Sequence, residues 1–205
     1  MKLLFAHGWG FDNHFWDNLI EYLPKHIEII QLDFGYTGNE ICDDIKNNTD
    51  FVCIGHSLGC LWLLKHIEVP KFFIPINGFD CFYTYIPEAE IQRIIHNLDR
   101  KMSAQMRGFY KACGTDLKKE INWNMAVLKE GLHWLANWNL EEKRKMLSCP
   151  IKALCSQSDK IITTDMSTKI WGAGNIIWSQ EGGHVLPLIH PEWCAQQIME
   201  VINAL

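Results

Sequence analysis

Short apolar runs and amphipathic stretches alternate along much of this chain. Apolar runs that are typical of buried strands occupy residues 2–6, 27–32, 51–54, 71–76, 151–155 and 175–179. Helical spacing of apolar side chains occupies residues 15–23, 58–68, 164–170 and 191–205. Parallel strands are buried on both faces and read as continuous apolar runs, and their alternation with helices indicates β-α-β units. The pattern therefore predicts an α/β fold with a mostly parallel sheet of about six strands flanked by helices.

Between residues 80 and 147 the pattern is helical throughout, without the apolar runs of strands. We therefore divide the chain into a core, residues 1–79 and 148–205, and a helical cap, residues 80–147. On a helical wheel of the cap, apolar side chains share one side: Ile91, Ile94, Ile95, Leu98, Met102, Met106 and Phe109. Basic side chains cluster away from that side: Arg93, Arg100, Arg107 and Lys111. If this segment forms one continuous helix, it presents a basic stripe, whereas a break at Ser103 or Gly108 would blur the stripe.

The charge of this segment contrasts with that of the whole chain. Residues 93–119 hold seven Lys or Arg and two Asp, a local charge of +5, whereas the chain has a formal charge of −5. A run of charge is often only a solvated helix face, but local positive charge also suits an acidic partner. Both interpretations stay open. The negative overall charge disfavours nucleic acid as a partner.

Composition is ordinary for one globular domain, with 48% hydrophobic and 21% charged residues among 205. No apolar run approaches the roughly 18 residues of a membrane span, and the first ten residues lack the layout of a signal peptide. The eight cysteines show neither metal spacing nor a secreted disulfide pattern, which indicates buried thiols in a reducing cytoplasm. We therefore expect no membrane partner, no metal and no cofactor. The oligomeric state stays open, with a monomer as the simplest case.

The most informative motif lies where an apolar run gives way to a helical pattern. A Gly-x-Ser-x-Gly sequence, from Gly55 to Gly59, joins a predicted strand to a predicted helix, and this context makes Ser57 the candidate nucleophile. Two backbone N–H groups are candidate oxyanion-hole donors. One belongs to Leu58, at the start of the helix, and the other to Trp9, in the Gly-rich loop after the first strand. An ordinary Gly/Ser turn in a β-α unit is the alternative.

Two further polar residues follow predicted strands later in the chain. Asp159 comes after strand 151–155 and His184 after strand 175–179, so a nucleophile, an acid and a histidine occur in that order. His184 is thus the candidate general base and Asp159 the acid that orients it. Each also has a plainer interpretation, because an Asp can cap a turn and a His after two glycines can be a loop residue. Asp33, which follows an earlier strand, is the rival acid.

On these motifs the chain resembles the α/β-hydrolase superfamily and, within it, the pimeloyl-[acyl-carrier protein] methyl ester esterases of biotin synthesis. The matching positions run through nearly the whole chain: His7-Gly8-Trp9-Gly10, Phe15-Trp16, residues 33–38, Gly55 to Gly59, Gly131-Leu132, residues 156–161, His184 and His190-Pro191. The resemblance implies Ser57 as nucleophile, Asp159 as acid and His184 as base, with oxyanion donors at Trp9 and Leu58. It also implies that an acyl-carrier protein, a strongly acidic partner, binds the basic cap residues Arg93, Arg100, Arg107 and Lys111.

The chain departs from this family at two places. It starts directly at the strand before His7, where the family has a further strand pair, and its segment 39–50 is short, with room for about three helical turns at most. The resemblance implies hydrolysis of the methyl ester of pimeloyl-carrier through an acyl-enzyme, with methanol leaving. Apolar cap residues such as Met102, Met106 and Phe109 are candidates for lining an acyl channel. The rivals are another ester or thioester hydrolase or a lyase on the same fold, and a non-enzymatic binding protein for an acidic partner.

Overall fold

The computed structural model describes residues 1–38, 40–41, 45, 51–117 and 120–203. Within them, seven strands form one sheet in the order β3-β2-β1-β4-β5-β6-β7. The strands are β1 (Lys2–Ala6), β2 (Glu28–Phe34), β3 (Glu40–Ile41), β4 (Phe51–His56), β5 (Phe72–Ile76), β6 (Ala153–Ser156) and β7 (Ile176–Ser179). The short β3 is antiparallel to β2, and the other six described strands run parallel. This arrangement confirms the predicted α/β fold with a mostly parallel sheet.

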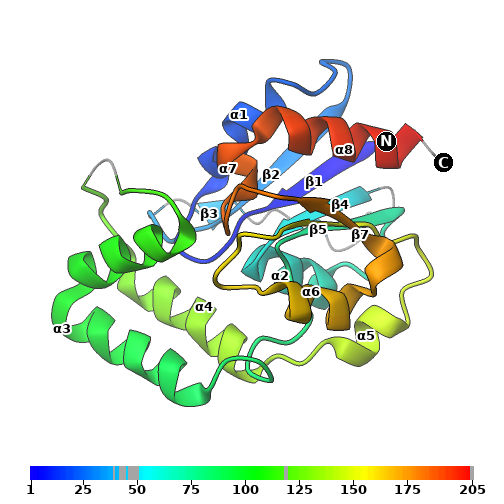
Figure 1. Ribbon diagram of the computed structural model, residues 1–205. Coiled ribbons are helices and arrows are strands. Elements are labelled where there is room, and N and C mark those ends of the chain that lie inside the picture. The colour runs from blue at the N-terminus through cyan, green and yellow to red at the C-terminus, as the bar shows by residue number, and fades with distance from the viewer. Residues whose placement is uncertain (39, 42–44, 46–50, 118–119, 204–205) are drawn as a thin grey trace.

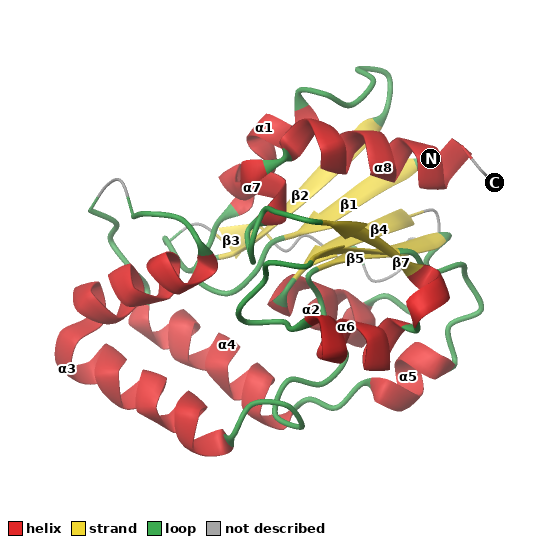
Figure 2. Cartoon of the chain, in the orientation of Figure 1, coloured by secondary structure: helices red, strands yellow, loops and turns green. Residues whose placement is uncertain are grey.

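Helices cover both faces of the sheet (Figures 1 and 2). One face carries α1 (Asp17–Ile20), α7 (Leu186–Ile189) and α8 (Pro191–Asn203), and the other carries α2 (Leu58–His66) and α6 (Thr164–Trp171). Two short 3-10 helices, η1 (Asn13–Trp16) and η2 (Ala173–Asn175), complete the core. Every residue from 51 to 64 is buried, since β4 lies inside the sheet and α2 is apolar on nearly all sides. Of residues 39–50, where we expected helical turns, most lie outside the described residues.

Between β5 and β6 the described residues form three helices, of which the two longer ones stand beside the sheet (Figure 1). They are α3 (Glu88–Cys113), α4 (Met125–Asn137) and α5 (Glu141–Lys145). The segment is therefore helical, as its apolar pattern predicts. We call residues 80–147 the cap, and its status as a unit separate from the core stays a prediction.

The long cap helix α3 is not the continuous helix that a single basic stripe requires. The backbone of Lys101 has φ −151° and ψ 54°, outside helical values, and α3 turns back on itself (Figure 1). Ile91 and Leu98 are buried on the first arm, and Met106 and Tyr110 are buried on the second. The helical phase is lost between the arms. The condition of one continuous helix is therefore not met, and no single stripe is formed by these residues: Arg93, Arg100, Arg107 and Lys111.

The two ends of the cap are joined where the cap meets the core. Asp80 and Arg144 form an ion pair with a nitrogen-to-oxygen distance of 2.6 Å, and only 5% and 17% of their side chains are exposed. The carbonyl oxygen of Asp80 accepts a hydrogen bond of 2.9 Å from the N–H of Leu140. Cys81 and Asn139 form an antiparallel β-bridge beside this pair. The segments that enter and leave the cap therefore hold each other in place.

We predict that Arg144→Met lowers the free energy of unfolding by about 3 kcal/mol, because it leaves the buried Asp80 carboxylate without its counter-charge. Urea unfolding followed by circular dichroism measures the change. Lys145→Met is the matched control, since Lys145 pairs with Glu141 and Glu142 on an exposed helix face and should leave the unfolding midpoint unchanged. Equal shifts for the two variants would show that the buried pair does not stabilise the cap base.

Candidate active site

Ser57 lies at the sharp turn between β4 and α2. Its backbone has φ 53° and ψ −121°, a strained conformation for a residue with a side chain. A Cβ on Gly55 would lie 2.5 Å from the Cα of Cys60, and a Cβ on Gly59 would overlap the carbonyl oxygen of Ala6. Both glycines are therefore needed for the turn to pack, and the turn presents the Ser57 hydroxyl at the carboxyl edge of the sheet.

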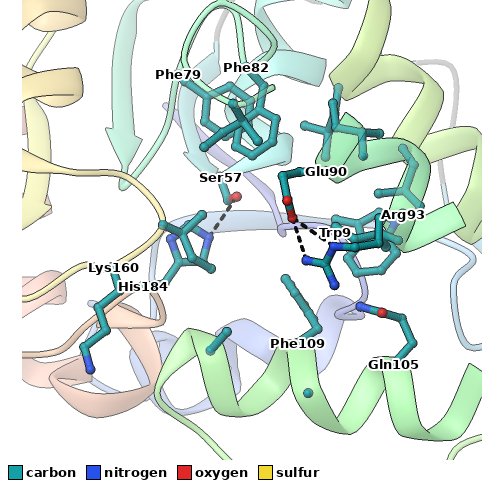
Figure 3. A pocket seen from close by; sticks show the side chains of 18 of the residues that line it. Trp9, Ser57, Phe79, Phe82, Glu90, Arg93, Gln105, Phe109, Lys160 and His184 are labelled. Carbon is teal, nitrogen blue, oxygen red and sulfur yellow. Dashed lines mark hydrogen bonds and ion pairs between the residues drawn. The ribbon is translucent and has the colours of Figure 1, made fainter. Parts of the chain in front are cut away.

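The side chains of Ser57, His184 and Asp159 form one chain of hydrogen bonds. His184 Nδ1 lies 2.8 Å from Asp159 Oδ2, and His184 Nε2 lies 3.0 Å from Ser57 Oγ (Figure 3). Because a carboxylate only accepts hydrogen bonds, Nδ1 carries the proton and Nε2 accepts from the hydroxyl. The backbone N–H groups of Ile161 and Ile162 donate to the other Asp159 oxygen at 2.7 and 3.0 Å. The carboxylate is thus held by three donors, which fixes the orientation of the imidazole.

The two backbone N–H groups expected to bind an oxyanion belong to Leu58, directly after Ser57, and to Trp9, in the loop after β1. Leu58 is the first residue of α2, so its N–H is one of the unpaired donors at a helix start, where the dipole favours negative charge. Trp9 follows β1, which pairs directly with β4. In the described part of the chain, neither N–H donates to a protein acceptor. Both N–H groups are therefore free to donate, and their role as oxyanion donors stays a prediction.

The cap holds the Trp9 loop against the core. The hydroxyl of Tyr110 in α3 donates to the carbonyl oxygen of Gly10, and the indole N–H of Trp9 donates to the carbonyl oxygen of Leu128 in α4, both at 2.8 Å. Gly131 lets α4 come this close, since a Cβ there would lie 2.7 Å from the Trp9 ring. The Gly131-Leu132 pair thus has a packing role, and the cap positions one of the two candidate oxyanion donors.

A cavity of about 510 Å³ extends from Ser57 and His184 towards the cap (Figure 3). Its lining is mainly apolar and includes Phe79, Phe82, Ile91, Phe109, Leu132 and Leu135. Three charged residues also line it, namely Glu90, Arg93 and Lys160. Glu90 and Arg93 form an ion pair of 2.5 Å and lie across the cavity from His184 in Figure 3. The volume is in the range of small-molecule sites, and the lining suits an apolar chain.

Comparisons with known proteins support this description. A curated relative, the pimeloyl-[acyl-carrier protein] methyl ester esterase of Legionella pneumophila (strain Paris), is 27% identical, and the match covers 78% of this chain and 77% of the relative. A crystal structure of a hydrolase from Pseudomonas aeruginosa PA01 superposes with a TM-score of 0.81 at 15% identity, over 98% of this chain and 89% of that one. BioG from Haemophilus influenzae superposes with a TM-score of 0.65 at 17% identity, over 94% and 92%. No family model matches the sequence.

The likeness to solved structures decides the architecture. This chain has the α/β-hydrolase fold. In an α/β-hydrolase, nucleophile, acid and histidine follow one another in that chain order, at loops on the carboxyl edge of the sheet. Ser57 follows β4, Asp159 follows β6 and His184 follows β7, so the three hydrogen-bonded side chains lie at the places where this fold carries its chemistry.

Asp33, which the sequence offers as the rival acid, makes a different contact. Its carboxylate lies 3.7 Å from His7 Nε2 and accepts a hydrogen bond of 2.9 Å from the N–H of Gly35. Asp159 is the acid that the structure places against His184. Among the described residues, no group of three or more His, Cys, Asp or Glu is arranged to hold a metal ion, and no described helix is long and apolar enough to cross a membrane.

The expected cap residues are divided between the cavity and the surface. Of the three apolar residues expected to line an acyl channel, Phe109 lines the cavity, whereas Met102 and Met106 are not among its lining residues and Met106 is buried close to Gly10. Arg93 also lines the cavity, with 61% of its side chain exposed. The other three basic residues are exposed and lie on both arms of α3: Arg100, Arg107 and Lys111.

His56 makes a contact with the site that the sequence pattern does not reveal. It is fully buried, its ring stacks on Phe15 with centroids 4.5 Å apart, and its Nε2 lies 2.8 Å from the carbonyl oxygen of His184. Since a carbonyl only accepts, Nε2 carries the proton, and Nδ1 has no partner in the described part of the chain. Burial, and after it the proximity of His184, lowers the pKa of His56 well below its ordinary value. His56 is therefore a neutral donor.

This lowered pKa predicts a loss of stability in acid. Below about pH 6.5 the unfolded chain takes up a proton on His56 that the folded chain refuses, so the free energy of unfolding falls as the pH falls. One such group changes the free energy of unfolding by at most about 1.4 kcal/mol per pH unit. His56→Gln retains an N–H donor but does not titrate. Between pH 7 and 5, its free energy of unfolding in urea should therefore fall by about 1–2 kcal/mol less than that of the wild type. His26→Gln, which removes an exposed histidine, should not reproduce this difference.

Proposed function

We propose that this protein is a serine carboxylesterase that hydrolyses the methyl ester of pimeloyl-[acyl-carrier protein] in biotin synthesis, in the cytoplasm. The observation that carries the proposal is the Ser57–His184–Asp159 hydrogen-bonded chain at the end of an apolar cavity. The relatives from Legionella pneumophila that bear this activity in their names support the substrate. Seven described cysteines are free thiols, which supports a reducing compartment.

In the proposed reaction, the Ser57 oxygen attacks the carbonyl carbon of the methyl ester while His184 Nε2 takes the hydroxyl proton. The carbonyl oxygen becomes an oxyanion and accepts hydrogen bonds from the N–H groups of Trp9 and Leu58. Asp159 stabilises the imidazolium that forms. When the tetrahedral intermediate collapses, the bond between the carbonyl carbon and the methoxy oxygen breaks, and His184 gives its proton to that oxygen, which leaves as methanol. Water then attacks the acyl-enzyme with His184 again as base, releasing Ser57 and a carboxylate.

The character of the cavity supports an ester with an apolar chain as substrate. Transfer of a neutral methyl ester and its methylene chain from water to this lining costs little free energy, whereas transfer of a carboxylate costs its hydration. The cavity therefore favours entry of the ester and release of the acid formed from it. Glu90, Arg93 and Lys160 are the charged residues of the lining. The carrier-linked end of the chain would lie near Glu90 and Arg93, across the cavity from His184 (Figure 3).

We expect Ser57→Ala to lower kcat for the methyl ester of pimeloyl-carrier by at least ~10⁴-fold, because no other group can form the acyl-enzyme. Methanol release measures this directly. In a bacterial strain that lacks its own esterase for this step, the wild-type chain should restore growth without biotin and Ser57→Ala should not.

Ser167→Ala is the matched control, since Ser167 is a buried serine of α6 outside the cavity lining. It should retain activity and restore growth. Hydrolysis of simple methyl esters without activity on the carrier-bound ester, or without growth, would retain an esterase and remove the biotin assignment.

We further propose that the acyl-carrier protein binds at the exposed basic residues of the cap: Arg93, Arg100, Arg107 and Lys111. The two arms of α3 that carry them also line the cavity, so a carrier bound there would hold its acyl chain near the cavity mouth. Their positive charge suits a strongly acidic partner. The kink separates the residues into two pairs rather than a stripe, which predicts a contact that spans both arms.

Charge reversal tests this surface. Arg107→Glu combined with Lys111→Glu should raise KM for the carrier-bound ester roughly tenfold and leave KM for free dimethyl pimelate unchanged. The rise in KM should disappear as the salt concentration is increased from about 0.05 to 0.5 M. The control is Lys25→Glu combined with Lys169→Glu, which makes the same change in net charge at exposed residues of the core. Equal effects of both double variants would place carrier binding elsewhere.

A further inference from the structure

The loop that carries His184 has no regular secondary structure of its own. β7 ends at Ser179 and α7 begins at Leu186, and between them Gly182 and Gly183 have positive φ values of 112° and 56°. Such glycines leave a loop many accessible conformations. Contacts from other parts of the chain must therefore hold the backbone of His184 in the position from which its imidazole reaches Ser57.

Two side chains from the core donate to the backbone carbonyl oxygen of His184. The Asn77 amide nitrogen, Nδ2, lies 2.9 Å from this oxygen, and His56 Nε2 lies 2.8 Å from it. Asn77 Nδ2 also donates to the carbonyl oxygen of Gly183 at 2.8 Å. These contacts are mostly buried, where a hydrogen bond is electrostatically stronger than in water. The carbonyl is thus fixed from two directions.

Asn77 connects this loop to the other two loops of the site. Its Oδ1 accepts a hydrogen bond of 2.9 Å from the N–H of Ser156, and the Ser156 carbonyl oxygen accepts one of 3.3 Å from the N–H of Asp159. Directly before Asn77, the carbonyl oxygen of Ile76 accepts a hydrogen bond of 3.2 Å from the N–H of Ser57. One buried residue after β5 therefore contacts the segments that carry the acid and the histidine, and its neighbour contacts the serine.

The backbone of Asn77 explains why this residue type occurs here. Its φ is 44°, in the left-handed region, which Asn tolerates better than most residues with a side chain, and it is 1% exposed. The amide group supplies both the donors and the acceptor that the three contacts need, whereas a carboxylate could not donate to the two carbonyl oxygens. A strained, buried residue that is held by several contacts is a feature of functional sites.

We propose that Asn77 is a positioning residue for the reaction of Ser57, with His56 as a second donor that shares its task. This inference rests on the proposed role of His184 as the base. By holding the His184 carbonyl, the two side chains keep imidazole Nε2 within reach of the Ser57 hydroxyl during both proton transfers. Misplacement of a reacting group by about 1 Å can cost a factor of 10² in rate.

The first test is Asn77→Gly, which permits the same backbone conformation and removes the side chain. We expect kcat to fall by roughly 10- to 100-fold with KM changed less than about twofold. A fluorophosphonate that reacts with Ser57 separates positioning from loss of folding. The final amount of label should stay at one per chain, while the rate constant of labelling falls with kcat. Asn175→Gly is the control, because Asn175 Nδ2 also donates to a backbone carbonyl, that of Trp171 at 3.0 Å, but has no contact with His184.

The second test compares two replacements of His56. His56→Phe keeps an aromatic ring against Phe15 and loses the donor, so its labelling rate constant should fall. His56→Gln keeps an N–H donor and should label faster than the Phe variant. A labelling rate constant like that of the wild type in both Asn77→Gly and His56→Phe would overturn the inference. So would a lower final amount of label with an unchanged rate constant, which is the result of misfolding.

These outcomes are distinct from failure of the proposed function. If the wild type labels with fluorophosphonate but does not hydrolyse the carrier-bound methyl ester, the substrate assignment fails, and the labelling rate constants still test the positioning role. If the wild type hydrolyses that ester and Asn77→Gly does so equally well, the function stands and the positioning role is overturned.

Discussion

The close packing of the Ser57 turn against the end of β1 is the contact on which the rest of the structure depends. Gly59 leaves no room for a side chain between α2 and the carbonyl oxygen of Ala6. This contact brings the start of α2, with the candidate donor Leu58, beside the loop that follows β1 and carries the candidate donor Trp9. A helix displaced by the width of one methyl group would move the Leu58 N–H away from this loop. Backbone packing thus sets the geometry of the site before side chains such as His184 complete it.

Much of this arrangement could be predicted because it follows from local rules. Buried parallel strands read as continuous apolar runs, and β1 has the bounds that its run predicts. Parallel strands place their carboxyl ends on one edge, so polar residues that follow different strands meet in space. This reasoning selected Ser57, Asp159 and His184 from a chain with nine histidines, and the structure brings the three within hydrogen-bonding distance.

The features that could not be predicted depend on contacts between distant segments. A helical wheel assumes a constant turn per residue. Ser103 and Gly108 are candidate breaks in the sequence, but the bend in α3 falls at Lys101, which is neither a proline nor a glycine. The bend becomes understandable in the folded protein, where Asn97 of one arm donates to Gln105 of the other at 2.9 Å and both arms line one cavity. Asn77 is similar. In the sequence it only marks the end of a strand, since its hydrogen-bonding partners lie many residues away along the chain.

The junction of Asp80 with Arg144 has a consequence for how such a protein can diversify. The two ends of the cap lie together, so the core keeps the same contacts at the cap base whatever segment joins these ends. The entropy of closing a loop grows only slowly with its length. Insertions, deletions and rearrangements within the cap can therefore accumulate without changing the positions of β5 and β6. The cap residues that line the cavity can change in this way while the core contacts that hold Ser57, His184 and Asp159 together stay the same.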